Sequence, residues 1–373
     1  MAGIYIHIPF CRRACHYCDF HFTTNLKNTE PLVQSILKEI ELQADYLNGE
    51  PLQTIYFGGG TPSLLPTSDI EKIIDAISQK HSVESGAEIT LEANPEDLSK
   101  TKLSELKSIA INRLSLGTQS FIDSELKWMN RMHTSNQAIE SIRNAQAFGF
   151  NNISIDLIFG LPNQTRNDWT YNLEAALKLD VQHISSYGLT VENKTVLANR
   201  ILKGTEQKPD DALATEFFKM NMEFLPANGF EHYEISNFAK EGCISRHNSS
   251  YWRGIPYLGL GPSAHSFNGT SRQWNVRSNA AYTSAIASHK PFFETEDLLA
   301  KDQLNEHIMI GLRTKWGIQK SYLDSIQKGA WNVVKEASAQ LDPSCFTLSD
   351  SAIYLSQKGK LVADKLAADL FFD

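Results

Sequence analysis

Apolar residues follow two alternating patterns along the first two hundred positions of the chain. Short runs rich in β-branched residues, typical of buried strands, are each followed by a longer amphipathic stretch with helical spacing. The pattern predicts strands at residues 4–8, 54–57, 88–93, 113–116, 153–159 and 183–189. It predicts helices between them at residues 31–46, 68–79, 99–109, 137–148 and 169–179. This order favours an α/β fold with a parallel sheet and right-handed crossovers.

The predicted strand–helix units are fewer than the eight of a closed barrel, so an open barrel and a doubly wound sheet are both consistent with the pattern. Either architecture places its chemistry at the C-terminal ends of the strands. Polar and glycine residues do follow or end the predicted strands, at Cys11, 58–61, Glu92, Gln119 and Asp156.

The alternating rhythm stops near residue 200. We expect a helix at 210–225 and a strand at 230–235, followed by an ordered loop at 239–278, which is rich in Gly, Pro, Asn and Ser. From about residue 299 helical stretches alternate with turns, which predicts a small α-rich, winged-helix-like module. The expected division is a core at residues 1–225 and a C-terminal domain at residues 226–373.

Composition and charge narrow the function classes. The 373 residues carry a net charge of −8, which argues against a nucleic-acid partner held mainly by electrostatics. No apolar run reaches the ~18 residues of a membrane-spanning helix, and the first residues lack the pattern of a signal peptide. Three of the five cysteines fall close together, unlike a secreted disulfide scaffold, so we expect the reducing cytoplasm.

The cysteines that matter most are Cys11, Cys15 and Cys18, in the sequence CRRACHYC directly after the first predicted strand. Three thiolates on one tight loop can each ligate one iron of a [4Fe–4S] cluster. The fourth iron then keeps an open site, which the amino and carboxylate groups of S-adenosylmethionine (SAM) can chelate.

Two other interpretations of the triplet are a zinc site and a disulfide. Zinc would need His16 or His21 as a fourth ligand, and zinc sites favour paired C-x2-C knuckles, of which the sequence has no second one. A disulfide is disfavoured in a cytoplasmic chain. We interpret the distant Cys243 and Cys345 as buried or incidental.

A ligand pocket is predicted at the ends of the next strands. The glycines of GGGTP, residues 58–62, let the backbone approach a ligand closely. Glu92 and Gln119 end the third and fourth strands, and Arg131 can pair with a carboxylate. Asp156 lies inside the fifth strand, where a charge is costly to bury without a partner or ligand. Taken singly, Glu92 and Arg131 are better explained as surface charges or caps.

The segment YIHIPFCRRACHYCDF resembles the cluster-binding loop of the radical SAM superfamily, and within it the branch of oxygen-independent coproporphyrinogen oxidases and heme chaperones. The resemblance covers essentially the whole chain and implies a partial (β/α)6 barrel with a C-terminal domain. It implies a [4Fe–4S] cluster on the three cysteines and SAM contacts from Tyr5, Gly59, Gly60, Thr61, Glu92, Gln119, Arg131 and Asp156.

Two features place the chain within that branch. The oxidases carry a further cysteine two residues after the third ligand, where this chain has Phe20, and an N-terminal extension that is not seen here. HNSSYW, residues 247–252, matches the H-N-x-x-Y-W motif typical of the chaperones. An imidazole is a good axial ligand of heme iron, and aromatic rings pack on porphyrin faces. The expected heme contacts are His247, Asn248, Tyr251 and Trp252.

The resemblance therefore implies a heme chaperone that passes heme to an acceptor hemoprotein, such as one of respiration, as a monomer or homodimer. We assign no catalytic residue. The main alternative is a radical SAM coproporphyrinogen oxidase, which decarboxylates a porphyrinogen in heme biosynthesis. A third reading is a SAM-binding scaffold with neither activity. The remaining histidines at 183, 232, 265 and 307 are interpreted as structural or surface residues.

Overall fold

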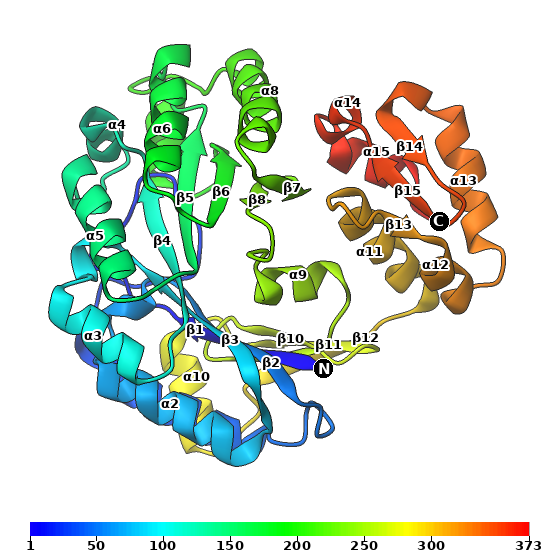
Figure 1. Ribbon diagram of the computed structural model, residues 1–373. Helices are drawn as coiled ribbons and strands as arrows, with labels where there is room; N and C mark the ends of the chain where they lie inside the picture. Colours follow the sequence, from blue (N-terminus) through cyan, green and yellow to red (C-terminus); the bar gives the residue numbers. More distant parts are fainter. Residues whose placement is uncertain (373) are drawn as a thin grey trace.

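A curved parallel sheet forms the body of the molecule in the computed structural model, which describes residues 1–372 (Figure 1). Its first six strands are β1 (Ala2–Ile8), β2 (Leu52–Gly59), β3 (Val83–Ala93), β4 (Arg113–Gln119), β5 (Ile153–Phe159) and β6 (His183–Gly188). Neighbouring strands of this set pair in parallel and in chain order. A doubly wound sheet would reverse its strand order at a switch point, so the open barrel is the architecture found.

Helices cover the outer face of this sheet. They are α1 (Thr29–Leu42), α2 (Thr67–Lys80), α3 (Lys100–Ser108), α4 (Asp123–Trp128), α5 (Ser135–Ala147), α6 (Arg166–Lys178), α7 (Val196–Leu202) and α8 (Asp211–Ala227). The short α4 and α7 were not expected from the sequence. Thr134 and Thr165 begin α5 and α6 with capping boxes, which satisfy backbone N–H groups that a helix leaves free.

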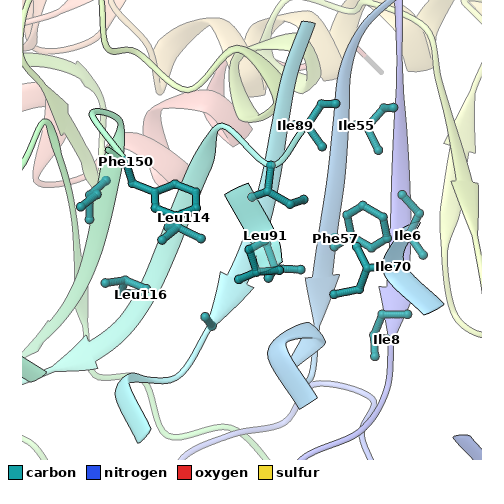
Figure 2. Packing of buried hydrophobic residues seen from close by; sticks show 14 of the residues in the cluster. Ile6, Ile8, Ile55, Phe57, Ile70, Ile89, Leu91, Leu114, Leu116 and Phe150 are labelled. Carbon is teal, nitrogen blue, oxygen red and sulfur yellow. The ribbon is translucent and has the colours of Figure 1, made fainter. Parts of the chain in front are cut away.

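The strands have two different faces because successive side chains point to opposite sides. Figure 2 shows the outer face, where apolar side chains of β1 to β4 meet each other and Ile70 of α2. Ile6, Phe57, Leu91 and Leu114 on that face are fully buried. The alternate positions carry polar side chains and point into the barrel. The same alternation that builds the core therefore fills the interior with groups that can bind a ligand.

The sheet continues beyond the barrel in both directions. At one edge β8 (Asn237–Ala239) pairs with β6, and β7 (Glu231–Glu234) pairs with β8. At the other edge β9 (Tyr257–Leu260) runs parallel to β1 and is followed by β10 (His265–Phe267), β11 (Ser271–Asn275) and β12 (Phe293–Asp297). Helix α10 (Asn279–Ala287) lies between β11 and β12 in the chain.

The expectation of an ordered loop at residues 239–278 is wrong. That segment holds helix α9 (Arg246–Trp252) and strands β9, β10 and β11. The strands are short, and glycine and serine interrupt their apolar pattern. Gly259 illustrates the cause, because a Cβ there would come 2.0 Å from the carbonyl oxygen of His265. Only glycine allows β10 to cross so close to β9.

A second body lies beside the barrel (Figure 1) and has its own apolar core, which begins at Leu304. It contains α11 (Ala300–Leu312), β13 (Ile318–Gln319), α12 (Lys320–Ile326), α13 (Ala330–Gln340), β14 (Phe346–Leu348), β15 (Ala352–Leu355), α14 (Gln357–Lys360) and α15 (Ala363–Asp369). Its helix and strand order is winged-helix-like, as expected. The main sheet, however, continues past residue 225 to β12, so the two apolar cores divide near residue 300.

Candidate functional site

The cysteine loop is held firmly at the C-terminal end of β1. Cys11 N–H donates to Thr23 O (3.0 Å), and Thr23 N–H donates to Pro9 O (2.7 Å), which closes the base of the loop. From the far side, Asn130 Nδ2 donates to Ala14 O (2.7 Å). These contacts fix the backbone of the loop before any ligand binds.

Cys11, Cys15 and Cys18 are free thiols, and all three line one cavity of about 460 Å³. Thr61 Oγ1 donates to Cys11 Sγ (3.6 Å), and Arg131 Nη1 donates to Cys15 Sγ (3.5 Å). Burial raises the pKa of Cys18 to about 11, so an iron ion would have to displace its proton. Hydrogen bonds to the ligand sulfurs tune a bound iron–sulfur cluster, and Cys11 and Cys15 already accept such bonds.

The histidines of the zinc interpretation make other contacts. His16 Nδ1 lies 2.8 Å from Trp128 O, and His21 Nε2 lies 2.7 Å from Asn279 Oδ1. Among residues 1–372, no three His, Cys, Asp or Glu side chains are grouped to hold a single metal ion. The thiols line the cavity wall instead, which suits a larger group.

The glycine turn after β2 brings backbone against the cysteine loop. Gly59 has φ +108, which favours glycine. A Cβ on Gly60 would lie 2.7 Å from Phe10 O and 2.9 Å from Ile8 O, both backbone atoms. The turn can therefore lie this close to the loop only because Gly60 has no side chain.

Glu92 joins the glycine turn to the barrel interior. Its carboxylate accepts hydrogen bonds from the Tyr56 hydroxyl (2.7 Å) and from Gly59 N–H (3.1 Å). Burial raises the pKa of Glu92 to about 7, and nearby Asp156 adds to the rise. Burial likewise raises the pKa of Asp156 to about 6. Two desolvated carboxyls facing one cavity suit a cationic ligand, as the SAM ammonium and sulfonium are.

Arg131 supplies the positive charge at the same cavity. Its Nη2 donates to Asn94 Oδ1 (2.5 Å) and Gly117 O (2.7 Å), whereas Nε is buried without a partner in the described chain. Gln119 ends β4 with φ +65, a strained conformation for a residue with a side chain. An orphaned donor and a strained residue at one cavity are typical of a ligand site.

Seven of the eight residues expected to contact SAM line this cavity: Gly59, Gly60, Thr61, Glu92, Gln119, Arg131 and Asp156. Tyr5 is not among the lining residues and lies behind Gly58, whose Cβ would come 2.9 Å from its ring. Sequence reasoning missed Asn94, which donates to Thr61 Oγ1 (3.2 Å) and accepts from Arg131. Its position two residues after Glu92, just past the strand end, was the available signal.

The HNSSYW motif forms helix α9, which lies against β1 and β2. His247 is 1% exposed and hydrogen-bonds Thr54 Oγ1 (2.8 Å) through Nδ1 and the Tyr251 hydroxyl (2.7 Å) through Nε2. It stacks on Tyr56 with ring centroids 4.9 Å apart. Burial lowers the pKa of His247 to about 3, so the ring is neutral.

The other residues of the motif face different neighbours, and Trp252 faces the C-terminal module. Tyr251 meets Tyr257 edge-on at 4.6 Å, and Asn248 N–H donates to Ser245 Oγ at the helix start. Trp252 Nε1 is buried with no partner in the described chain, and the Arg313 guanidinium lies 6.0 Å from its ring. The motif thus combines a buried histidine, hydrogen-bonded at both ring nitrogens, with two partly exposed aromatic rings.

An open parallel barrel with a three-cysteine loop at its C-terminal end and a polar cavity beside it defines a radical SAM protein. Residues 5–175 match the model of the Radical SAM superfamily. The chain also resembles coproporphyrinogen III oxidase (HemN) from Escherichia coli, with a TM-score of 0.84 and 19% identity over 99% of this chain and 90% of that one. At that identity the likeness shows the fold.

The relatives by sequence are more specific. The heme chaperone HemW of Bacillus subtilis is 36% identical over 98% of this chain and 98% of its own. The heme chaperone HemW of Lactococcus lactis is 37% identical, with 84% and 82% covered, and that of Mycobacterium tuberculosis is 32% identical, with 99% and 94% covered. The chain belongs to the HemW family of the radical SAM superfamily.

No helix in residues 1–372 is both long enough and apolar enough to cross a membrane.

Proposed function

We propose that this chain binds heme and delivers it to an acceptor hemoprotein, with a [4Fe–4S] cluster and exchangeable SAM in the barrel cavity. The observation that carries the proposal is the 36% identity with a heme chaperone over 98% of both chains. Phe20 stands where the resemblance gives the oxidases a further cysteine, so the decarboxylase alternative is not favoured.

Within this proposal, Cys11, Cys15 and Cys18 hold the cluster. Gly59, Gly60, Thr61, Glu92, Gln119, Arg131 and Asp156 hold SAM, and Tyr5 supports Gly58 from behind. When bound, the cluster supplies an open iron site and an electron for the sulfonium. The protein's own task is to position: Arg131 holds the loop through Cys15, and Glu92 fixes the glycine turn.

We also propose a functional division of the chain at residue 225. Residues 1–225 would carry the cluster and SAM, and residues 226–373 would handle heme and meet the acceptor, with His247, Asn248, Tyr251 and Trp252 bordering the heme. Ligation of iron by His247 requires one of its two hydrogen bonds to break, either that of Nδ1 with Thr54 or that of Nε2 with Tyr251. We further propose that the acceptor is a hemoprotein of respiration, that the chain acts in the cytoplasm, and that it is a monomer or homodimer.

The test is an anaerobic hemin titration followed by the Soret band, on wild type and on His247→Ala. Saturable one-to-one binding by wild type is the expected result, and weaker binding by the variant would assign the motif helix to the heme site. Absence of saturable binding would contradict the proposal. Formation of protoporphyrinogen from coproporphyrinogen with SAM and a reductant would favour the oxidase instead.

A further inference from the structure

An aromatic surface continues from the barrel interior onto the strand extension at the edge of β1. Tyr5 of β1 is level with Gly259 of β9, and Tyr257 of β9 is level with Phe267 of β10. His265 of β10 is opposite Trp274 of β11, and Phe267 is opposite Arg272. Because side chains alternate along strands, Tyr257, His265, Phe267, Arg272 and Trp274 share the face that points into the barrel.

His265 is the exposed imidazole on this surface. Its ring lies 6.4 Å from the Trp274 ring. Partial desolvation of the ring and the Arg272 charge lower the pKa of His265, so the ring is neutral and has a lone pair for a metal at neutral pH. His247 differs on the decisive point, because it is buried and both of its ring nitrogens are hydrogen-bonded.

The neighbours of His265 match the other parts of a heme molecule. Trp274 is half-buried and offers a flat apolar ring beside it. Arg272 lies 5.8 Å over the Phe267 ring and pairs with Glu306 of α11. A guanidinium at this position can exchange a side-chain carboxylate for a heme propionate.

The surface adjoins both sites already described. Tyr257 meets Tyr251 of the motif helix at 4.6 Å, so HNSSYW supplies one border of the surface. On the other side His265 lies near enough to His7 that a proton on His265 would lower the pKa of His7, and the His7 ring stacks 6.0 Å from His21 of the cysteine loop. A heme on this surface would therefore lie between the motif helix and the cluster loop.

We propose that His265 is an axial ligand of the heme iron, with Trp274 against the macrocycle and Arg272 on a propionate. The inference rests on the proposed heme-binding function and specifies its ligand. With His265 as the ligand, heme can bind while His247 keeps its hydrogen bonds to Thr54 and Tyr251. The motif helix then borders the site through Tyr251, and His265 on β10 ligates the iron.

The test is an anaerobic hemin titration of the full chain, on wild type and two matched variants. His265→Asn removes the ligand, and His289→Asn changes another exposed histidine, in the turn after α10, as the control. We expect His265→Asn to weaken binding about tenfold or more. It should also lose the histidine-ligated iron spectrum, and added imidazole should restore that spectrum. His289→Asn should match wild type, and circular dichroism should show all three proteins equally folded.

Each outcome bears on a different statement. Saturable binding by wild type with an unchanged spectrum and affinity in His265→Asn overturns the inference and leaves the heme-binding function standing. Weaker binding by His265→Asn with an unchanged iron spectrum, or without rescue by imidazole, also overturns it, because the histidine would then only shape the surface. Absence of saturable binding by wild type overturns both.

Discussion

At the scale of single residues, the three cysteines of the loop all line one cavity with their thiols. Replacing Cys11, Cys15 or Cys18 with Ala should abolish the broad ~400 nm absorption of the cluster, because three ligands are the minimum for this site. Absorbance of the anaerobically reconstituted protein measures it. Cys243→Ala is the control and should keep the band. Retention of the band in all three single variants would contradict the assignment.

The buried carboxyl group of Glu39 makes the stability of the protein depend on pH. Its carboxylate in α1 is fully buried and accepts hydrogen bonds from Tyr282, Asn275 Nδ2 (2.6 Å) and Gly261 N–H (2.7 Å). Burial nevertheless raises the pKa of Glu39 to about 7 from 4.5. The folded state therefore keeps a proton that the unfolded state releases between these pH values.

The contribution of Glu39 to the free energy of unfolding is fully present below pH 4.5 and is lost as pH rises through about 7. The change amounts to roughly 3 kcal/mol. Anaerobic urea unfolding at pH 5.5 and pH 8 spans roughly 2 kcal/mol of this change, and we compare wild type with Glu39→Gln, which cannot titrate. Equal pH dependence in the two proteins would show that Glu39 is not the group responsible.

The strand pattern and the resemblance together predicted much of the candidate site. Seven of the eight SAM contacts that the resemblance implied line the cavity, and five of them lie at or just past a strand end, where parallel strands bring their termini together. Asp156 lies inside β5, and Arg131 reaches the cavity from the segment between α4 and α5. Tyr5 lies one layer behind, since it pairs with Tyr56 inside the strands and its ring lies behind Gly58. Sequence spacing cannot give that depth. Sequence spacing also does not distinguish the exposed His265 from the buried His183. The exposure of His265 depends on how β10 packs across Gly259 of β9.

At the scale of elements, the glycine turn after β2 determines how close the cysteine loop can lie. Gly60→Ala should displace the loop, because the added Cβ would meet backbone atoms of Phe10 and Ile8 at less than 3.0 Å. We expect at least about tenfold weaker SAM binding to the reconstituted protein, measured by equilibrium dialysis. Gly86→Ala on β3 is the matched control, since a Cβ there meets nothing within 4 Å. Equal SAM affinity in the two variants would contradict the close-approach argument.

Helix α9 depends on Glu88 of β3. The Glu88 carboxylate accepts from Arg246 N–H (3.2 Å) and His247 N–H (3.1 Å), and it lies 3.8 Å from the buried Arg113. Glu88→Gln should lower the free energy of unfolding by roughly 3 kcal/mol, because the Arg113 charge loses its partner. Hydrogen exchange should rise at residues 246–252. Glu84→Gln on the same strand should change neither, and unchanged exchange in Glu88→Gln would show that α9 is held by other contacts.

Strand and helix boundaries show where sequence patterns succeed. The six barrel strands were predicted because buried parallel strands read as continuous β-branched runs. Strands β9, β10 and β11 were not, since each is short and carries glycine, serine or charged residues. They exist because β1 offers an open edge that pairs with β9. Tertiary pairing of that kind leaves little trace in local pattern.

At the scale of the whole molecule, two apolar cores divide the chain near residue 300, while the functional groups divide it differently. The cluster loop and SAM cavity lie at one end of the barrel. The motif helix lies at the border with the C-terminal module, where Arg313 reaches Trp252 and also pairs with Glu234. The module is therefore placed to contact the proposed heme site through Arg313.

The most direct test of the account is transfer of heme. The reconstituted chain is loaded with one equivalent of hemin, freed of excess, and mixed anaerobically with an apo-hemoprotein of respiration. The account predicts that the acceptor spectrum appears faster than with the same amount of free hemin, and that His265→Asn lowers this rate. Appearance of the acceptor spectrum no faster than with free hemin would contradict the assignment of a heme chaperone.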